Sequence, residues 1–147
     1  MGSRGDVNDL GRLPPVQFHE NEVCVLRIPD TPTSLNRVGQ RGSWKATHFE
    51  KKRWQSILEK YLMMARLPRP LPHFLRVGAV IVFPTRHRRD SGNFKSPLEK
   101  ALGDALVNGG WLPDDTPRWW EFRDFEFARE TGPNTTIITL DYGRETG

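Results

Sequence analysis

The sequence predicts one domain with an α/β (α+β) fold, in the order β-α-β-α-β-β, in which helices cover one side of a mixed sheet. Its length of 147 residues fits a single domain. Two segments repeat apolar residues with helical spacing, and four short runs are rich in β-branched and aromatic residues. Proline and glycine clusters separate these segments. We expect a flexible leader over residues 1–19 and the folded domain over residues 20–147.

The first half of the domain begins with a β-type run over residues 22–28, which ends at a proline-rich turn. A basic loop with several glycines follows over residues 36–46. Thr47 and Glu50 then form a capping box, and the helix after it carries one apolar stripe. The stripe consists of Trp54, Ile57, Leu58, Tyr61, Leu62 and Ala65. Prolines within residues 67–72 end this helix.

The second half starts with a strand over residues 75–83, which is apolar on both faces and is therefore expected in the centre of the sheet. A Ser-Pro-Leu-Glu sequence that begins at Ser96 predicts the N-terminus of a second helix. The Asn-Gly-Gly sequence at 108–110 predicts its end. Residues 119–127 and 135–140 are expected to form the last two strands, paired as a hairpin.

Positive charge is concentrated in one part of the chain. The net charge is +4, and residues 37–100 hold 15 of the 22 Lys and Arg residues but only four acidic residues. Such an excess attracts a polyanion, above all nucleic acid, although it could also be an ordinary solvated surface. The expected phosphate contacts are Arg37, Arg41, Lys45, Arg86, Arg88 and Arg89, with Lys51, Lys52 and Arg53 beside them. Trp44 either stacks on an unpaired base or packs against the sheet.

Several classes of protein are excluded by composition. A single cysteine, Cys24, allows no disulfide framework within the chain and no cysteine-based zinc site, which favours a reducing, intracellular setting. No run approaches the ~20 apolar residues of a membrane-spanning helix. The N-terminal residues lack the apolar segment of a secretory signal. The four histidines share no metal-ligand spacing.

Acidic residues with a lysine between them form the candidate site. Asp90 follows the central strand, whereas Asp114 and Asp115 follow the second helix, which carries Lys100 and Asp104. Mg²⁺ binds one or two carboxylates and keeps several waters, and a lysine beside it can stabilise charge on a phosphate. Each feature also has a simpler interpretation: the paired aspartates as a turn, Asp90 as part of a loop salt bridge, and Lys100–Asp104 as a surface ion pair.

The order and spacing of these groups resemble the RusA family of Holliday-junction resolvases, which occur in bacteria and phages. The similar stretches are Arg-Arg-Asp-x-x-Asn at 88–93, Lys-Ala-x-x-Asp-x-Leu at 100–106 and Asp-Asp at 114–115. An earlier Pro-Thr-Ser-Leu-Asn-Arg stretch at 32–37 is also similar to the family. Together the resemblance covers residues 23–142.

The resemblance implies a RusA-like fold and a homodimeric endodeoxyribonuclease that resolves four-way DNA junctions in recombination and repair. It implies Mg²⁺, or alternatively Mn²⁺, as the metal and no small-molecule cofactor. By position, Asp90 and Asp115 are implied as catalytic, metal-binding aspartates, Lys100 as the catalytic lysine and Arg89 as a DNA contact, with Asp114 as a further metal ligand. The implied location is the cytoplasm of a bacterial or phage-infected cell, without membrane attachment.

One position departs from the family pattern. The family places a second aspartate two residues after the first, and here that position is Gly92. Asn93, Asp104 or Asp114 could supply the missing ligand, because amide and carboxylate oxygens both suit Mg²⁺. The alternative function is a junction-binding protein with weak or no cleavage. A third possibility is a different basic α/β protein whose aspartates are structural.

Overall fold

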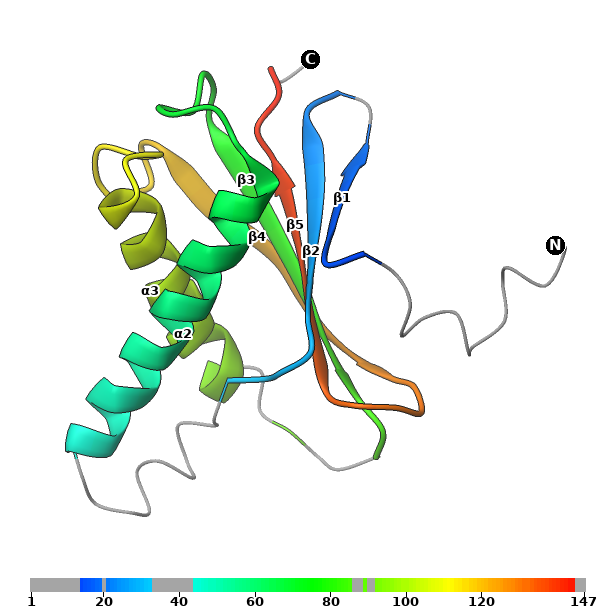
Figure 1. The fold of residues 1–147 in the computed structure, drawn as a ribbon. Helices are drawn as coiled ribbons and strands as arrows, with labels where there is room; N and C mark the ends of the chain where they lie inside the picture. Colours follow the sequence, from blue (N-terminus) through cyan, green and yellow to red (C-terminus); the bar gives the residue numbers. More distant parts are fainter. Residues whose placement is uncertain (1–13, 20, 33–43, 86–88, 90–91, 145–147) are drawn as a thin grey trace, which may run out of the picture.

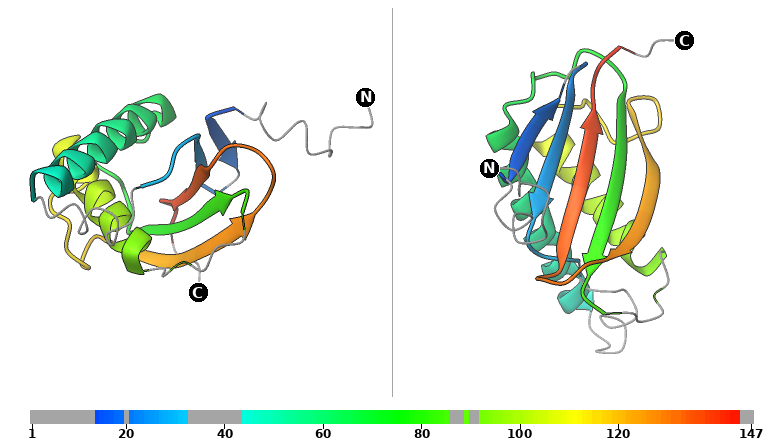
Figure 2. Two further views of the ribbon diagram at one scale, coloured as in Figure 1. Left: turned by 90° about the horizontal axis from the view of Figure 1, so that it is seen from below. Right: turned by 90° about the vertical axis from the view of Figure 1, so that its right-hand side faces the viewer.

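Five strands form one mixed sheet, and two helices lie together on one of its faces (Figures 1 and 2). The computed structural model describes residues 14–19, 21–32, 44–85, 89 and 92–144, and of residues 44–47 and 92 the backbone alone. The elements are β1 (Val16–His19), β2 (Val23–Ile28), α2 (Trp44–Ala65), β3 (Leu75–Phe83), α3 (Gly92–Asn108), β4 (Trp120–Arg129) and β5 (Thr135–Asp141). The prediction of a mixed α+β domain is therefore confirmed at this level.

The strands are ordered β1-β2-β5-β3-β4. β3 and β4 are parallel, and α3 forms the crossover between them that parallel strands need. The other neighbouring strands are antiparallel. β3 lies between β5 and β4, so the prediction of a central position for this strand is confirmed.

The predicted hairpin of the last two strands is wrong. β4 and β5 flank β3 on opposite sides, and the connection between them passes the end of β3 (Figure 2). Two strand spacings amount to about 10 Å, a distance that residues 130–134 span without difficulty. β3 is apolar on both faces, so pairing along both of its edges buries the most apolar strand in the centre of the sheet.

A short edge strand, β1, lies where the sequence predicts a flexible leader, and that prediction is wrong for this part of the chain. β1 pairs antiparallel with β2. The turn between them includes Asn21 and Glu22, with φ values of 65° and 62°. The alternation of Val16 and Phe18 before an asparagine-containing turn is the signal that indicates this hairpin. Residues 1–13 lie outside the described residues.

Both helices begin earlier than their capping motifs predict. α2 begins at Trp44, so the end of the predicted basic loop and Thr47 lie inside the helix. α3 begins at Gly92 and contains Pro97. Pro97 is the sixth residue of α3, so it removes one backbone hydrogen bond just after the first turn, whose N–H groups have no partner within the helix. The predicted end of α3 is confirmed, and Gly110 after it has a φ of 81°. In the part of the chain that the structure describes, neither helix could cross a membrane.

The hydrophobic core lies between the two helices and the sheet. The predicted apolar stripe of α2 contributes the buried Trp54, Leu58, Leu62 and Ala65, and the predicted face of α3 contributes the buried Leu98, Ala101, Leu102, Ala105 and Leu106. Trp111, in the loop after α3, is 1% exposed, and its indole Nε1 donates to the Leu67 carbonyl at 3.3 Å. This contact fastens the start of the 109–119 loop to the end of α2.

Candidate active site

Three of the predicted site residues meet beside α3. Lys100 lies in the middle of the helix, Asp104 lies one turn later, and Asp115 comes from the loop between α3 and β4. The Lys100 Nζ atom is 3.5 Å from Asp104 Oδ1 and 3.7 Å from Asp115 Oδ2. The structure therefore brings together a lysine and two carboxylates from two segments of the chain.

A second lysine joins this group from the other helix. The Lys51 Nζ atom on α2 lies 3.0 Å from Asp104 Oδ2. Sequence reasoning placed Lys51 among the phosphate contacts and missed this pairing, which depends on how α2 packs against α3. Asp104 thus faces two ammonium groups, and charges alternate in the order Lys51, Asp104, Lys100, Asp115. We call these four residues the charge cluster.

The charge cluster is open to solvent on the side of Lys100 and Asp115. Their side chains are 58% and 42% exposed, whereas Asp104 is 24% exposed. Exposed ion pairs of this kind contribute at most about 1 kcal/mol to folding. The cluster is therefore accessible to a large substrate and adds little to the stability of the fold.

Backbone and packing contacts hold Asp115 against α3. The Trp120 indole Nε1 donates to the Asp115 carbonyl oxygen at 3.0 Å. Gly103 on α3 leaves the space for this approach, because a Cβ atom there would lie 3.3 Å from Asp115 Cβ and 3.1 Å from Trp120 Cζ2. Sequence reasoning missed Gly103 and Trp120, since neither residue type by itself indicates a site.

Asp114 holds the turn that presents Asp115. Its Oδ1 atom accepts hydrogen bonds from the Thr116 backbone N–H at 3.0 Å and from the Thr116 hydroxyl at 2.6 Å. The hydroxyl bond, followed by the backbone bond, lowers the pKa of Asp114 below its ordinary value. The sequence predicts Asp114 as a metal ligand. In the structure, its Oδ1 atom instead accepts the hydrogen bonds that form a turn with Thr116.

Arg89 is anchored at the end of β3. Its guanidinium carbon lies 3.6 Å from the centroid of the Phe83 ring. Nη1 and Nη2 donate to the backbone carbonyl and the hydroxyl of Thr85, at 3.2 Å and 3.1 Å. Stacking and hydrogen bonds together restrict the orientation of this predicted DNA contact.

Asn93 lies on the same side of α3 as the charge cluster. It precedes Lys100 by two helical turns, and residues seven apart share a helix face. The next residue, Phe94, packs edge-on against Phe83, with ring centroids 5.7 Å apart. This contact fixes the start of α3 to the end of β3. Phe83 therefore contacts both Arg89 and the start of α3.

Other predicted residues lie outside the described residues. They are Asp90, Arg37, Arg41, Arg86 and Arg88. Lys45 and Trp44 belong to the first turn of α2, and Gly92 is the first residue of α3. Within the described ranges, no three His, Cys, Asp or Glu side chains lie close enough to hold a metal ion.

The described carboxylates differ in their suitability for a metal. Mg²⁺ takes oxygen ligands and needs only one or two carboxylates because it keeps several waters. Asp104 already faces Lys51 and Lys100, whereas Asp115 faces Lys100 alone and is more exposed. Of these two carboxylates, Asp115 therefore fits a Mg²⁺ ligand better.

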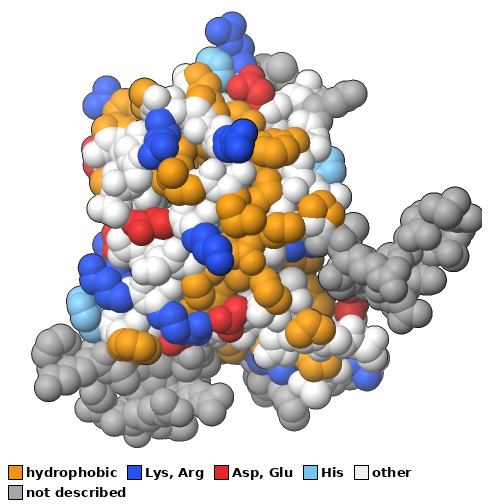
Figure 3. Space-filling model, viewed as in Figure 1, with side chains coloured by type: hydrophobic (Ala, Val, Ile, Leu, Met, Phe, Trp, Pro, Cys, Tyr) orange, Lys and Arg blue, Asp and Glu red, His pale blue; other side chains and the backbone are white. Residues whose placement is uncertain are grey.

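Basic side chains of α2 extend the charge cluster. Lys52 is exposed. Arg53 donates to Glu50 at 2.8 Å and to Asp30 at 2.7 Å, and the bond to Glu50, followed by that to Asp30, raises the pKa of its guanidinium. Figure 3 shows Lys and Arg side chains on the α2 side, next to a strip of hydrophobic side chains. Lys51 and Lys52 thus place positive charge beside the candidate site.

Comparisons with known proteins leave the family open. No model of a known protein family matches the chain, and no curated protein matches it significantly.

Proposed function

We propose that this chain is a Mg²⁺-dependent endonuclease that cuts four-way DNA junctions as a homodimer, with a RusA-like fold. The observation that supports this most directly is the position of Lys100 between Asp104 and Asp115, 3.5 Å and 3.7 Å from their carboxylate oxygens. An exposed lysine beside an exposed carboxylate, next to basic residues, suits the hydrolysis of a phosphodiester in a polyanion.

Each residue of the site has a distinct task in this proposal. Asp115 is a metal ligand, and Asp90 is its partner from the other loop. The chemistry that bound Mg²⁺ supplies at such a site is polarisation of the scissile phosphate and activation of a water molecule. Lys100 offsets the negative charge that develops on the phosphate oxygens. Asp104, held by Lys51, keeps Lys100 in place.

The DNA backbone is held by residues around this centre. Arg89, fixed against Phe83, presents a planar guanidinium that matches a phosphate. On α2, Lys51 beside Asp104 and the exposed Lys52 add positive charge. A four-way junction offers two equivalent strands for cutting, which matches a two-fold symmetric dimer.

Binding without cleavage is the second candidate function. Two observations favour it. Gly92 stands where the RusA family has an aspartate, and the Asp104 carboxylate already forms ion pairs with Lys51 and Lys100. In this case the protein binds junctions tightly at low salt and gives no product with Mg²⁺ or Mn²⁺. A Gly92→Asp variant that cuts would also favour it.

Cleavage of a synthetic four-way junction tests the proposal. We expect cleavage with Mg²⁺, none with a chelator, and loss of cutting with retained binding in Asp90→Asn, Asp115→Asn and Lys100→Ala. Glu99→Gln is the matched control, because it changes a neighbouring carboxylate on α3 outside the charge cluster. Cleavage that persists in both Asp90→Asn and Asp115→Asn contradicts the assignment.

A further inference from the structure

The helix side of the sheet has an uncovered apolar margin along the edge strand β1. Val16 and Phe18 lie directly opposite Leu26 and Cys24 of β2, which are fully buried in the core. Residues directly opposite each other share one face of a sheet, so Val16 and Phe18 point to the side of the helices. Phe18 is nevertheless 59% exposed, and no described element covers its ring.

One flank of α2 extends this apolar margin. The flank toward α3 carries Glu59, which accepts a hydrogen bond from Asn108 of α3 at 2.6 Å. Ile57, Tyr61 and Met64 share the opposite flank, on the side of α2 next to β1. Ile57 and Tyr61 pack against the core, whereas Met64 is 42% exposed. Figure 3 shows hydrophobic side chains that form a strip beside α2. We use the name apolar strip for Val16, Phe18, Ile57, Tyr61 and Met64.

The chain itself supplies a segment that can cover the apolar strip. Thirteen residues precede Pro14, and they join the domain directly before β1. The Arg27 backbone N–H donates to the Pro15 carbonyl oxygen at 2.8 Å, which fixes the point of entry beside β1. The six residue steps from Val7 to Leu13 span at most about 20 Å, whereas residues 57–64 rise about 10 Å along α2. The segment before Pro14 is therefore long enough to run along the whole strip.

The residue types of this segment suit an apolar surface. Val7, Leu10 and Leu13 recur at every third position. Residues three apart share one side of a helix, and they also repeat along one edge of a polyproline II segment. In either conformation the three apolar side chains can face the same surface, as contact with Phe18 and Met64 requires.

The charges of the segment are complementary to those beside the apolar strip. Asp6 and Asp9 each come one residue before an apolar residue of the segment. Lys60, next to Tyr61 on α2, and Arg66, just after α2, are exposed. Within the part of the chain that the structure describes, neither of these basic residues forms an ion pair. Two carboxylates of the segment can thus meet two basic side chains at the same end of the strip.

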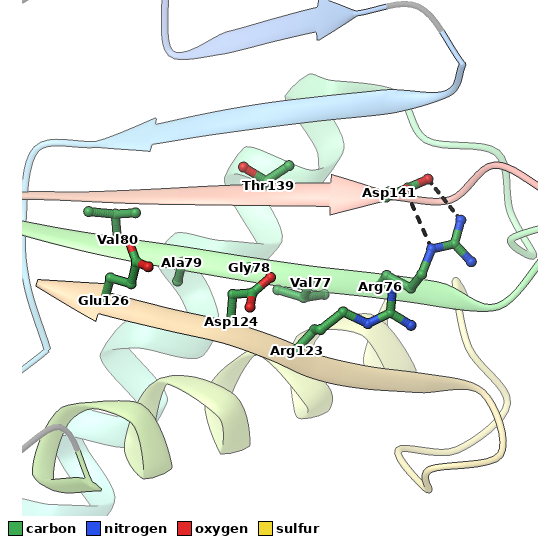
Figure 4. A pocket seen from close by; sticks show the side chains of 10 residues that line it. All are labelled: Arg76, Val77, Gly78, Ala79, Val80, Arg123, Asp124, Glu126, Thr139 and Asp141. Atoms are coloured by element: carbon green, nitrogen blue, oxygen red, sulfur yellow. Dashed lines mark hydrogen bonds and ion pairs between the residues drawn. The ribbon is translucent and has the colours of Figure 1, made fainter. Parts of the chain in front are cut away.

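The hollow on the opposite face of the sheet suits this segment less well (Figure 4). It has a volume of about 420 Å³, and Arg76 and Asp141 form an ion pair at one end, with Nη2 3.0 Å from Oδ1. Asp124 and Glu126 of β4 also line it. Apolar side chains placed there would remove these charged groups from water without giving them a partner, which is unfavourable.

We propose that residues 6–13 pack onto the apolar strip of their own chain, with Val7, Leu10 and Leu13 against Phe18 and Met64. The segment then covers the two most exposed side chains of the strip and completes the hydrophobic core at the β1 edge. The strip lies on the flank of α2 that faces away from α3, so the charge cluster stays accessible. The inference goes beyond the proposed function and does not depend on it.

Crosslinking of two introduced cysteines tests this packing in the full chain. In a Cys24→Ala background, Gly11→Cys adds a thiol to the segment without removing an apolar residue, and Met64→Cys adds one to the apolar strip. Met63→Cys is the matched control, because Met63 is 52% exposed but shares the outer face of α2 with the exposed Ser56. We expect a short bismaleimide to crosslink the Gly11→Cys/Met64→Cys chain at least ~5-fold faster than the Gly11→Cys/Met63→Cys chain, because packing raises the effective concentration of the first pair alone.

Serine substitutions of Val7, Leu10 and Leu13 test whether the apolar side chains hold the segment. In the Gly11→Cys/Met64→Cys chain they should lower the crosslinking rate to that of the Met63→Cys control, while circular dichroism shows that the domain stays folded. Equal rates for the two cysteine pairs in the chain without serines overturn the proposal, and so does a preference that the serines leave intact. A crosslink between two chains, identified by the mass of the product, also overturns it, because a second copy then occupies the strip. The measurement uses neither DNA nor metal, so its outcome is separate from that of the cleavage assay.

Discussion

Lys51 on α2 and Asp104 on α3 form an ion pair across the two helices, with Nζ 3.0 Å from Oδ2. The other oxygen of Asp104 faces Lys100 at 3.5 Å. The Asp104 carboxylate therefore connects two lysines: Lys51, which pairs with it across the two helices, and Lys100, which also faces Asp115. Lys51 thus affects the position of Lys100 through Asp104.

Lys51→Ala tests this link. Without Lys51, Asp104 has a single ammonium partner and draws Lys100 away from Asp115. We expect the single-turnover rate of junction cleavage at saturating DNA to fall ~10-fold, equivalent to about 1.4 kcal/mol of barrier. Lys52→Ala removes the same charge from an exposed neighbour and should weaken binding without this loss of rate. Equal rate losses in the two variants would show that charge alone matters.

Gly103→Ala tests the approach of Asp115 to α3. The new Cβ atom would lie 3.1 Å from Trp120 Cζ2 and 3.3 Å from Asp115 Cβ, so the loop must move. The strain of about 1–3 kcal/mol is offset in part by about 1 kcal/mol of better helix propensity. We expect chemical denaturation to show a modest net destabilisation. The cleavage rate should fall by more than the loss of folded protein accounts for. Ser96→Ala, exposed on the same helix, is the control for improved helix propensity without a steric contact, with a smaller gain than Gly→Ala. A Gly103→Ala protein as active as wild type would disprove the close fit.

The pKa of Asp114 should depend on Thr116. Hydrogen bonds from Thr116 hold this pKa below its ordinary value in the folded protein. Thr116→Val removes the hydroxyl donor, and we expect a carboxyl titration followed by NMR to show the Asp114 pKa rising toward its ordinary value. Because the folded pKa is lowered, the hydrogen bonds stabilise the fold above the unfolded pKa, and this contribution is lost as pH falls through the folded pKa. The difference in free energy of unfolding between wild type and Thr116→Val should therefore shrink toward zero as the pH is lowered. A difference that does not change with pH would contradict this role of the Asp114 carboxylate.

Cys24 should be unreactive in the folded protein. The side chain is buried on β2, and burial raises the pKa of its thiol to about 11 from the ordinary 9.0. The thiolate is the reactive form, so an aromatic disulfide reagent at about pH 8 should label the native chain far more slowly than the unfolded chain. Since the folded pKa is raised, the stability that the neutral thiol contributes is lost as pH rises above the unfolded value. Cys24→Ala serves as the blank, and rapid labelling under native conditions would contradict the burial.

Much of the fold could be predicted because amphipathic patterns are local. The stripe from Trp54 to Ala65 and the apolar run of β3 depend only on residue spacing, and both are where the sequence predicts them. The ends of the helices could not be predicted as well. Residues typical of helix caps, such as Thr47 and Ser96, lie inside these helices, which begin at Trp44 and Gly92.

The sequence by itself determined the two amphipathic helices, the central strand and the residue types of the candidate site, since each depends on neighbours along the chain. Only the tertiary structure decided that β5 lies between β2 and β3, because a short connection can reach either edge of β3. It also decided that Lys51 reaches Asp104 and that Gly103 admits Asp115. These contacts join elements distant in sequence, and their partners follow from how the helices pack on one another and on the sheet rather than from spacing.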